Sequence, residues 1–340
     1  ASLIMTSSNI RTILGSMEFG RRLDFKQTPS NVGNRYDVTK HKDHIRNHSK
    51  SHNTTAEVDS AFMYAGGESE KLIGRSDGCR DDVVRIATKA NPWGGNTLSR
   101  EGVRKQLETS LQRMKVKSVH LFYLHAPDYK VPIVETLEAV NQMHNEGKFK
   151  ELGLSNYSAW QVAQIHTICS TNSWVVPTVY QGMYNCVTRM VEKELFPCLR
   201  HFNMRFYAYN PLAGGILTGK HKFEDVGKDE PGRFFGTGGW VGTYRQRFWR
   251  KTNFDLVEEI KVLLQDIYGG EVTLAEAAYR WLYHHSSLDG SKGDGVIIGC
   301  STIEQYHANI ANTRGPGLDE RITKVMDQYW KQNATTCPDY

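Results

Sequence analysis

Eight short apolar runs recur along the chain, separated by segments with a helical pattern. The runs are almost continuously apolar, which is typical of parallel strands buried on both faces of a sheet. They occupy residues 12–17, 56–62, 83–90, 118–126, 149–156, 175–185, 205–212 and 295–301. Eight alternating units in a chain of 340 residues predict a single-domain α/β fold, the closed (β/α)8 TIM barrel. The alternative, a Rossmann sheet, is weakened because no GxGxxG motif follows the first run.

The segments between the runs carry apolar stripes at the spacing of a helix. These stripes consist of Val103, Leu107 and Leu111; Leu137, Val140 and His144; Val162, Ile165 and Cys169; and Leu274, Ala278 and Trp281. Gly147 follows the second stripe at the position of a C-terminal helix cap. Each stripe predicts a helix that packs on the barrel.

Residues 24–55 do not fit this pattern. They should carry the first barrel helix, yet Val32, Val38 and Ile45 are their only large aliphatic residues, and basic residues and histidines are frequent. We therefore predict one barrel domain over residues 1–340, in which this atypical polar segment stands in place of the first helix. It would form either a weakly docked helix or a long loop.

Composition and charge narrow the classes of protein. The net charge of +5 is spread along the chain, so a nucleic-acid surface is not required, and an anionic small ligand would fit equally well. No apolar run approaches the ~20 residues of a membrane helix, and the first residues lack the apolar core of a secretory signal. The six cysteines form no CxxC pair, which favours reduced thiols and a cytoplasmic protein.

Polar residues follow the predicted strands at the end where a barrel of this kind holds its active site. They are Asp59, Lys89, His125, Ser155 with Asn156, Gln181, Asn210 and Ser301, and Tyr64 lies in the loop after the second strand. Each has an ordinary alternative, such as a surface lysine, a core histidine or a helix-capping aspartate. Ionisable residues nevertheless end three successive strands, which favours a functional site.

Seven motifs in order resemble the aldo-keto reductase superfamily: VDSAFMY, IATKANPW, LFYLHAPD, LGLSNY, YQGMYN, YNPLAGG and SxxEQxxxN. The stretches GMYN, ELFPCLRHF, GRFFG and YHHS are similar to the subfamily of aflatoxin-aldehyde and succinic-semialdehyde reductases. The resemblance runs from about residue 12 to the end of the chain, with residues 24–55 as the exception.

The resemblance implies a catalytic tetrad of Asp59, Tyr64, Lys89 and His125. By the same resemblance, NADPH would deliver a hydride to a carbonyl carbon while Tyr64 protonates the carbonyl oxygen. Lys89 beside the phenol would lower the tyrosine pKa from its usual value of ~10. Asp59 would pair with Lys89, and His125 would donate a hydrogen bond to the carbonyl oxygen.

The resemblance also implies the cofactor site. Ser155, Asn156 and Gln181 would hold the carboxamide of the nicotinamide, and Tyr209 would stack on its ring. The segment that would wrap the pyrophosphate consists of Asn210, Pro211, Leu212, Ala213, Gly214, Gly215, Ile216, Leu217, Thr218, Gly219 and Lys220. Ser301, at the start of a helix, would bind the adenosine phosphate together with Gln305 and Asn309. Arg233 would add a cation, and with Lys220 it favours NADPH over NADH.

Substrate would meet His125, Trp93, Tyr244 and Arg247. A cation at Arg247 suits aldehydes that carry a carboxylate, although a solvated helix face would explain the same residues. We therefore expect NADPH-dependent reduction of semialdehydes, dialdehydes and aromatic aldehydes by a homodimer, without a metal, a membrane or a nucleic acid. The alternative is an NADPH-binding structural or interaction protein recruited from a reductase scaffold. A metal-dependent barrel hydrolase fits less well, because many of the histidines lie away from the strand ends.

Overall fold

The computed structural model describes residues 9–19, 56–76, 84–227, 232–236, 240–300 and 302–338. The atypical segment 24–55 and Ser301 lie outside these residues, so the predictions made for them are not examined by the structure.

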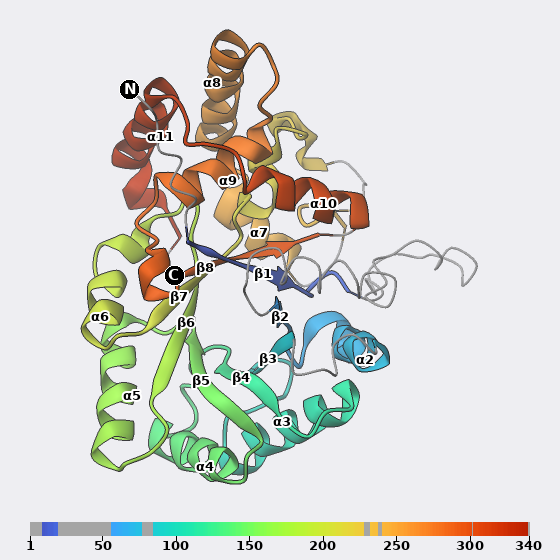
Figure 1. The fold of residues 1–340 in the computed structure, drawn as a ribbon, viewed down its shortest axis with the longest axis vertical. Helices are drawn as coiled ribbons and strands as arrows, with labels where there is room; N and C mark the ends of the chain where they lie inside the picture. Colours follow the sequence, from blue (N-terminus) through green and yellow to red (C-terminus); the bar gives the residue numbers. More distant parts are fainter. Residues whose placement is uncertain are drawn as a thin grey trace.

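Eight parallel strands form a closed barrel in chain order, and β8 pairs with β1 to complete it (Figure 1). The strands are β1 (Arg11–Gly15), β2 (Ala56–Asp59), β3 (Val84–Ala90), β4 (Val119–Leu124), β5 (Phe149–Ser155), β6 (Pro177–Met183), β7 (Arg205–Tyr209) and β8 (Gly295–Gly299). The predicted fold class and all eight predicted strands are confirmed. Most strands are shorter than their apolar runs, since the last residues of those runs leave the sheet to enter the loops.

Helices surround the barrel, with α2 to α6 following one another around one side, and α8, α9 and α11 lying together above the strands in this view (Figure 1). They are α2 (Glu68–Arg75), α3 (Arg100–Met114), α4 (Ile133–Asn145), α5 (Ala159–Thr171), α6 (Leu195–His201), α7 (Val241–Phe248), α8 (Lys251–Tyr268), α9 (Leu274–His284), α10 (Ile303–Asn312) and α11 (Glu320–Asn333). Short 3-10 turns are η3 (Tyr64–Gly67), η5 (Met190–Glu192), η6 (Ala213–Thr218), η7 (Phe223–Gly227), η8 (Gly290–Lys292) and η9 (Ala334–Thr336).

The apolar stripes lie in the helices α3, α4, α5 and α9, where the residues of the stripes are buried with one exception. His144 was expected in the stripe of α4 but is only half-buried, and its neighbour Met143 takes the core position. The helix ends at the predicted place, because Gly147 follows it with a φ of 73°. Only glycine adopts this left-handed conformation without strain.

The core has two layers. Inside the barrel, a cluster is formed by Ile13, Ala87, Leu121, Tyr123, Val179, Tyr207 and Ile297. A larger cluster lies outside, between the strands and the helices. Gly153 of β5 makes room for the inner layer, since a Cβ there would lie 2.3 Å from the Tyr123 ring.

Charged side chains line the amino-terminal end of the barrel. Glu57 accepts from Arg11 at 2.9 Å and from the Tyr207 hydroxyl at 2.8 Å. Glu151 pairs with Arg205 at 2.8 Å and with His120 at 2.9 Å. Each of the two carboxylates therefore has compensating donors, as partly buried charges require.

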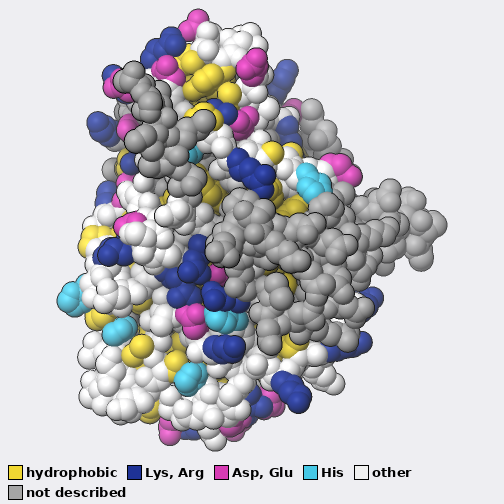
Figure 2. Space-filling model, viewed as in Figure 1, with side chains coloured by type: hydrophobic (Ala, Val, Ile, Leu, Met, Phe, Trp, Pro, Cys, Tyr) yellow, Lys and Arg dark blue, Asp and Glu magenta, His cyan; other side chains and the backbone are white. Residues whose placement is uncertain are grey.

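On the face drawn in Figure 2, the described basic side chains are interspersed with acidic ones rather than forming one large basic surface. Within the described ranges, no helix combines the length and the hydrophobicity needed to span a bilayer. Among those same residues, no three histidine, cysteine or acidic side chains come together as ligands for a metal ion.

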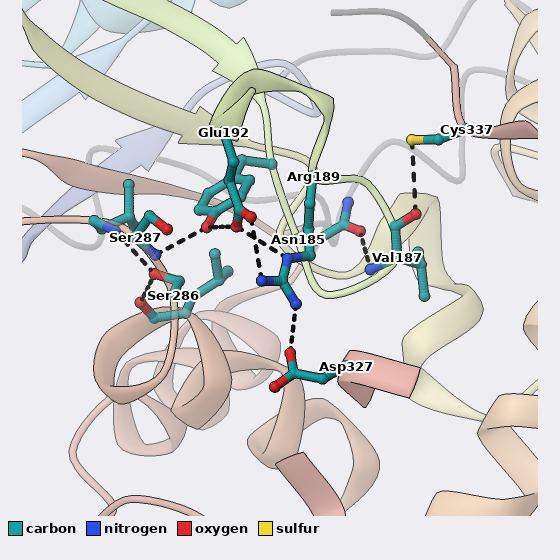
Figure 3. Close-up of polar contacts among 11 residues, drawn as sticks. Asn185, Val187, Arg189, Glu192, Ser286, Ser287, Asp327 and Cys337 are labelled. Carbon is teal, nitrogen blue, oxygen red and sulfur yellow. Dashed lines mark hydrogen bonds and ion pairs between the residues drawn. The ribbon is translucent and has the colours of Figure 1, made fainter. Parts of the chain in front are cut away.

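Arg189 joins the loop after β6 to the last long helix, α11 (Figure 3). Its guanidinium donates to Glu192 at 2.9 Å and to Asp327 of α11 at 2.6 Å. It also lies over the ring of Trp281, 5.1 Å from the centroid. Glu192 in turn accepts from the Tyr184 hydroxyl at 2.5 Å. One side chain therefore connects β6, α9 and α11.

We expect Arg189→Ala to lower the free energy of unfolding by about 1–3 kcal/mol, because charged groups lose their hydrogen bonds in a partly buried place. Arg321→Ala is the control. Arg321 pairs with Asp266 where the two side chains are 55% and 64% exposed, so its loss should change stability little. Urea unfolding measures both variants, and equal destabilisation would show that Arg189 acts as an ordinary surface residue.

Candidate active site

A buried ion pair lies at the carboxyl ends of β2 and β3. The Lys89 ammonium is 2.6 Å from Asp59 Oδ2, and neither side chain is more than 4% exposed. Nζ also donates to the Ser60 carbonyl at 2.7 Å and lies 3.5 Å from the Tyr64 hydroxyl. All three N–H groups of the ammonium therefore have an acceptor, which offsets the cost of burying the charge.

Aromatic rings surround this pair on the side of the barrel mouth. The Tyr64 ring meets His125 edge-on at 6.0 Å between centroids, and the Trp93 ring lies 5.0 Å from that of His125. Trp240 continues the wall, 5.8 Å from Trp93. The structure thus brings together the four residues of the expected tetrad, and Trp240 is an additional neighbour that no sequence pattern had indicated.

The expectation that Lys89 lowers the pKa of Tyr64 is wrong. Burial, followed by the negative charge of Asp59, raises the pKa of Tyr64 well above 10. The ammonium is closer to Asp59, at 2.6 Å, than to the phenol, at 3.5 Å, so the carboxylate compensates its charge. Tyr64 consequently carries its proton at neutral pH.

His125 is neutral at physiological pH. Burial and the nearby positive charge of Lys89 hold the pKa of its imidazole well below 6.5. Its Nδ1 is buried and has no hydrogen-bond partner within the described part of the chain. A neutral imidazole carries one N–H and can donate one hydrogen bond to a polar group placed beside Tyr64.

The ends of β5, β6 and β7 gather the residues expected to hold a carboxamide. Asn156 donates to the Ser155 hydroxyl at 3.1 Å and accepts from the Tyr209 hydroxyl at 2.9 Å. Gln181 donates to Asp59 Oδ1 at 2.8 Å, which links this group to the ion pair. Asn156 has a φ of 61°, a left-handed conformation that asparagine tolerates better than most residues.

The segment 210–220 forms the turn η6 after β7, together with the residues on either side of it. Ala213, Ile216 and Leu217 are buried in the outer core, so only their backbone can face a ligand. Gly215 has a φ of 116°, and the nearest atom to a Cβ built there would be Lys220 Cε at 3.9 Å. The backbone is therefore open to close approach at this position, beside an exposed lysine.

Arg233 and Tyr244 form a polar cluster with Asn210 at the barrel mouth. Arg233 donates to the Tyr244 hydroxyl at 2.6 Å, and that hydroxyl lies 3.2 Å from Asn210 Oδ1. Glu18 pairs with Arg233 at 3.1 Å. Asn210 Nδ2 is buried without a partner among the residues that the structure describes. The charge of Arg233 is thus partly compensated by Glu18, which the sequence did not indicate.

Arg247 lies one turn along α7 from Tyr244 and is partly exposed. Burial raises the pKa of Tyr209 to about 12, and the positive charge of Arg247 opposes this rise. Arg247 itself pairs with no carboxylate of the described residues. The sequence had placed it correctly on a helix next to Tyr244.

The expected phosphate site is only partly described. Helix α10 begins at Ile303, and its cap is Thr302, whose side chain accepts from the Gln305 backbone N–H at 3.2 Å. Asn309 donates to the Gly299 carbonyl at 3.2 Å. The helix start therefore lies two residues after Ser301, and Gln305 and Asn309 lie on the same face of α10, next to the end of β8.

Asn185 lies in the motif YQGMYN, but the sequence assigned it no role, and the structure shows it as a supporting residue. It is buried, and its amide donates to the Asn210 carbonyl at 2.9 Å. Its backbone forms an antiparallel bridge with Thr188. Asn185 thereby holds the start of the segment 210–220, and its position at the end of the sixth apolar run was the available signal.

Comparison with known proteins agrees with this geometry. The model of the Aldo/keto reductase family matches residues 14–328 of this chain. Aflatoxin B1 aldehyde reductase member 2 of Mus musculus is 50% identical, over 97% of this chain and 87% of the relative. Aflatoxin B1 aldehyde reductase member 4 of Homo sapiens is 49% identical over 97% of this chain and 96% of its own length. The resemblance inferred from the motifs is confirmed, and the chain is a member of the aldo/keto reductase family.

Proposed function

We propose that this aldo/keto reductase reduces aldehydes to alcohols with NADPH, and that Tyr64 donates the proton. The observation that carries the proposal is the buried Lys89–Asp59 pair, whose ammonium lies 3.5 Å from the Tyr64 hydroxyl at the mouth of the barrel. The identity to relatives named as aldehyde reductases supports the class of substrate.

Each side chain at the site has a separate role in the proposed reaction. NADPH, when bound, supplies the hydride. Tyr64 holds its proton up to high pH and releases it to the carbonyl oxygen, and the Lys89 N–H stabilises the phenolate that forms. Asp59 keeps Lys89 charged and oriented. His125, as a neutral donor beside Tyr64, orients the carbonyl oxygen and stabilises its growing negative charge.

The residues present fit a dinucleotide. Ser155, Asn156 and Gln181 offer donors and acceptors for the carboxamide, and the backbone at Gly215 leaves room for a diphosphate. The buried and unpartnered Asn210 amide is a further donor at the start of this segment. Lys220 pairs with no carboxylate of the described residues, and its charge favours a phosphate-rich cofactor such as NADPH. The homodimer implied by the resemblance and the cytoplasmic location favoured by the cysteines stay predictions.

Arg247 favours substrates that carry a carboxylate. It lies near Tyr209 with no compensating acid in the described part of the chain, whereas Arg233 already pairs with Glu18. An aldehyde with a distal carboxylate, such as succinic semialdehyde, would place its anion there and its carbonyl near His125. Trp93 and Tyr244 would form the walls of the substrate site.

Consumption of NADPH and of NADH, followed by the absorbance of the reduced cofactor, tests the proposal. Succinic semialdehyde, a dialdehyde and 2-nitrobenzaldehyde are the substrates. We expect turnover with NADPH, and a lower KM for the carboxylated aldehyde than for an uncharged one of equal length. A protein that binds NADPH tightly but turns over none of the three would support the alternative of a structural or interaction protein.

Two of the ionisable groups at the reacting centre, Tyr64 and His125, predict a flat pH profile between their pKa values. Tyr64 loses its proton only as the pH rises through a pKa above 10, and His125 gains a second proton only as the pH falls through a pKa below 6.5. Both stay in their active forms between these values. We therefore expect Tyr64 and His125 to cause no inflection in kcat at saturating NADPH across this interval. Burial lowers the pKa of Lys89 below its usual value, so a fall on the alkaline side is assigned to that ammonium, whereas an inflection on the acid side of neutrality would contradict the assignment of His125.

A further inference from the structure

The turn that carries Tyr64 has an unfavourable backbone. Ala65, Gly66 and Gly67 follow the tyrosine with φ values of 49°, 64° and 95°. Three consecutive residues in the left-handed region are disfavoured, above all at Ala65, which has a Cβ. The surrounding structure must therefore hold the turn in this shape.

Arg113 of α3 fills the space beneath the turn. Its Nη1 donates to the Phe62 carbonyl at 2.8 Å and to Glu70 Oε2 at 2.9 Å. The guanidinium lies over the Phe62 ring, 4.4 Å from the centroid. A Cβ at Gly67 would lie 2.5 Å from Arg113 Cζ, so the turn rests directly on the guanidinium.

Glu70 connects this arginine to the strand that carries Lys89. It is fully buried, and its Oε1 accepts from the Thr88 hydroxyl at 2.6 Å. Thr88 immediately precedes Lys89 in β3. The Phe62 backbone N–H donates to the Lys89 carbonyl at 3.1 Å, which joins the same two segments from the other side.

We propose that the partly buried Arg113–Glu70 ion pair is a positioning pair that sets the separation between the Tyr64 hydroxyl and the Lys89 ammonium. Arg113 holds Phe62, two positions before Tyr64, and Glu70 holds Thr88, the residue before Lys89. Among the residues that the structure describes, the pair makes no hydrogen bond or ion pair with the expected cofactor site or the substrate walls. This inference rests on the proposed role of Tyr64 as proton donor.

The Arg200–Asp294 pair provides a matched control. Asp294 is fully buried like Glu70, and the arginine side chains are 26% and 20% exposed in the two pairs. Asp294 directly precedes β8, at the opposite end of the barrel from Tyr64. Breaking this ion pair with Arg200→Met should destabilise the fold without moving Tyr64.

The decisive variants are Arg113→Met and the pair Thr88→Val and Thr88→Ser. We expect Arg113→Met to lower kcat by about a hundredfold, the cost of displacing a reacting group by roughly 1 Å, with the Kd for NADPH and the KM for aldehyde unchanged. The solvent deuterium isotope effect on kcat should rise, because proton donation becomes slower. Thr88→Val should lower kcat to a smaller extent, and Thr88→Ser, which keeps the hydroxyl, should restore it.

Hydrogen exchange of the peptide 60–67 tests the positioning without relying on catalysis. Its amides should exchange faster in Arg113→Met than in Arg200→Met at equal loss of thermal stability. If the wild type reduces no aldehyde, the proposed function fails while this measurement still decides the role of the pair. Equal exchange in the two variants, or equal losses of kcat at matched stability, would overturn the inference.

Discussion

Lys89→Met is expected to destabilise the protein by about 3–5 kcal/mol, because it leaves the Asp59 carboxylate buried without its counter-ion. Asp59 is only 3% exposed and would keep one hydrogen bond, from Gln181. Its charge cannot be hydrated without disrupting the barrel interior. Urea unfolding of the purified variant at pH 7 measures the effect.

The same substitution should lower kcat by about 10²–10³-fold, the usual effect of removing one preorganised donor from a developing anion. The double variant Asp59→Asn, Lys89→Met separates the two consequences. It removes both charges, so most of the lost stability should return, whereas kcat should stay low. A double variant no more stable than Lys89→Met would show that the unpaired carboxylate is not the cause of the destabilisation.

The strands could be predicted because a barrel strand is buried on both faces and leaves an apolar run in the sequence. Their ends could not, since the chain stays apolar where it leaves the sheet. The sixth run extends to residue 185, but β6 ends at Met183. The next residues form a bridge and support the Asn210 carbonyl, which are tertiary interactions that no local pattern records.

Part of the candidate site was visible for the opposite reason. Asp59, Lys89 and His125 interrupt apolar runs near the ends of three successive strands. Each has an ordinary explanation alone, but their occurrence together favoured a site. Tyr64 lies outside any run and could be recognised only through the family motif. The direction of its pKa shift could not be predicted, because it depends on burial and on the ammonium being compensated first by Asp59.

The Arg113–Glu70 pair could not be recognised in the sequence, because each residue lies in a helix with an ordinary polar pattern. Glu70 stands in the polar stretch GESEK and Arg113 in LQRMKVK, and both stretches are typical of solvated helix faces. The fold places α2 and α3 side by side, so these two polar residues face each other instead of water. Long-range pairing of this kind has no periodicity and cannot be predicted from one sequence.

Tyr64→Phe should lower kcat by about 10²–10⁴-fold, the usual contribution of a general acid. The phenyl ring keeps its contact with His125, and the lost hydroxyl lies 3.5 Å from Lys89, a weak hydrogen bond. We therefore expect the fold and the Kd for NADPH to be preserved. Single-turnover rates and quenching of tryptophan fluorescence by NADPH measure the two properties separately.

Tyr123→Phe is the matched control for this loss. Tyr123 is a second buried tyrosine beside the same ammonium, with Lys89 Nζ 5.4 Å from its ring centroid, compared with 5.0 Å for Tyr64. It belongs to the inner layer of the barrel. Its variant should therefore turn over aldehyde like the wild type. If both variants lost activity equally, the packing around Lys89 would be responsible, and if neither lost activity, another group would donate the proton.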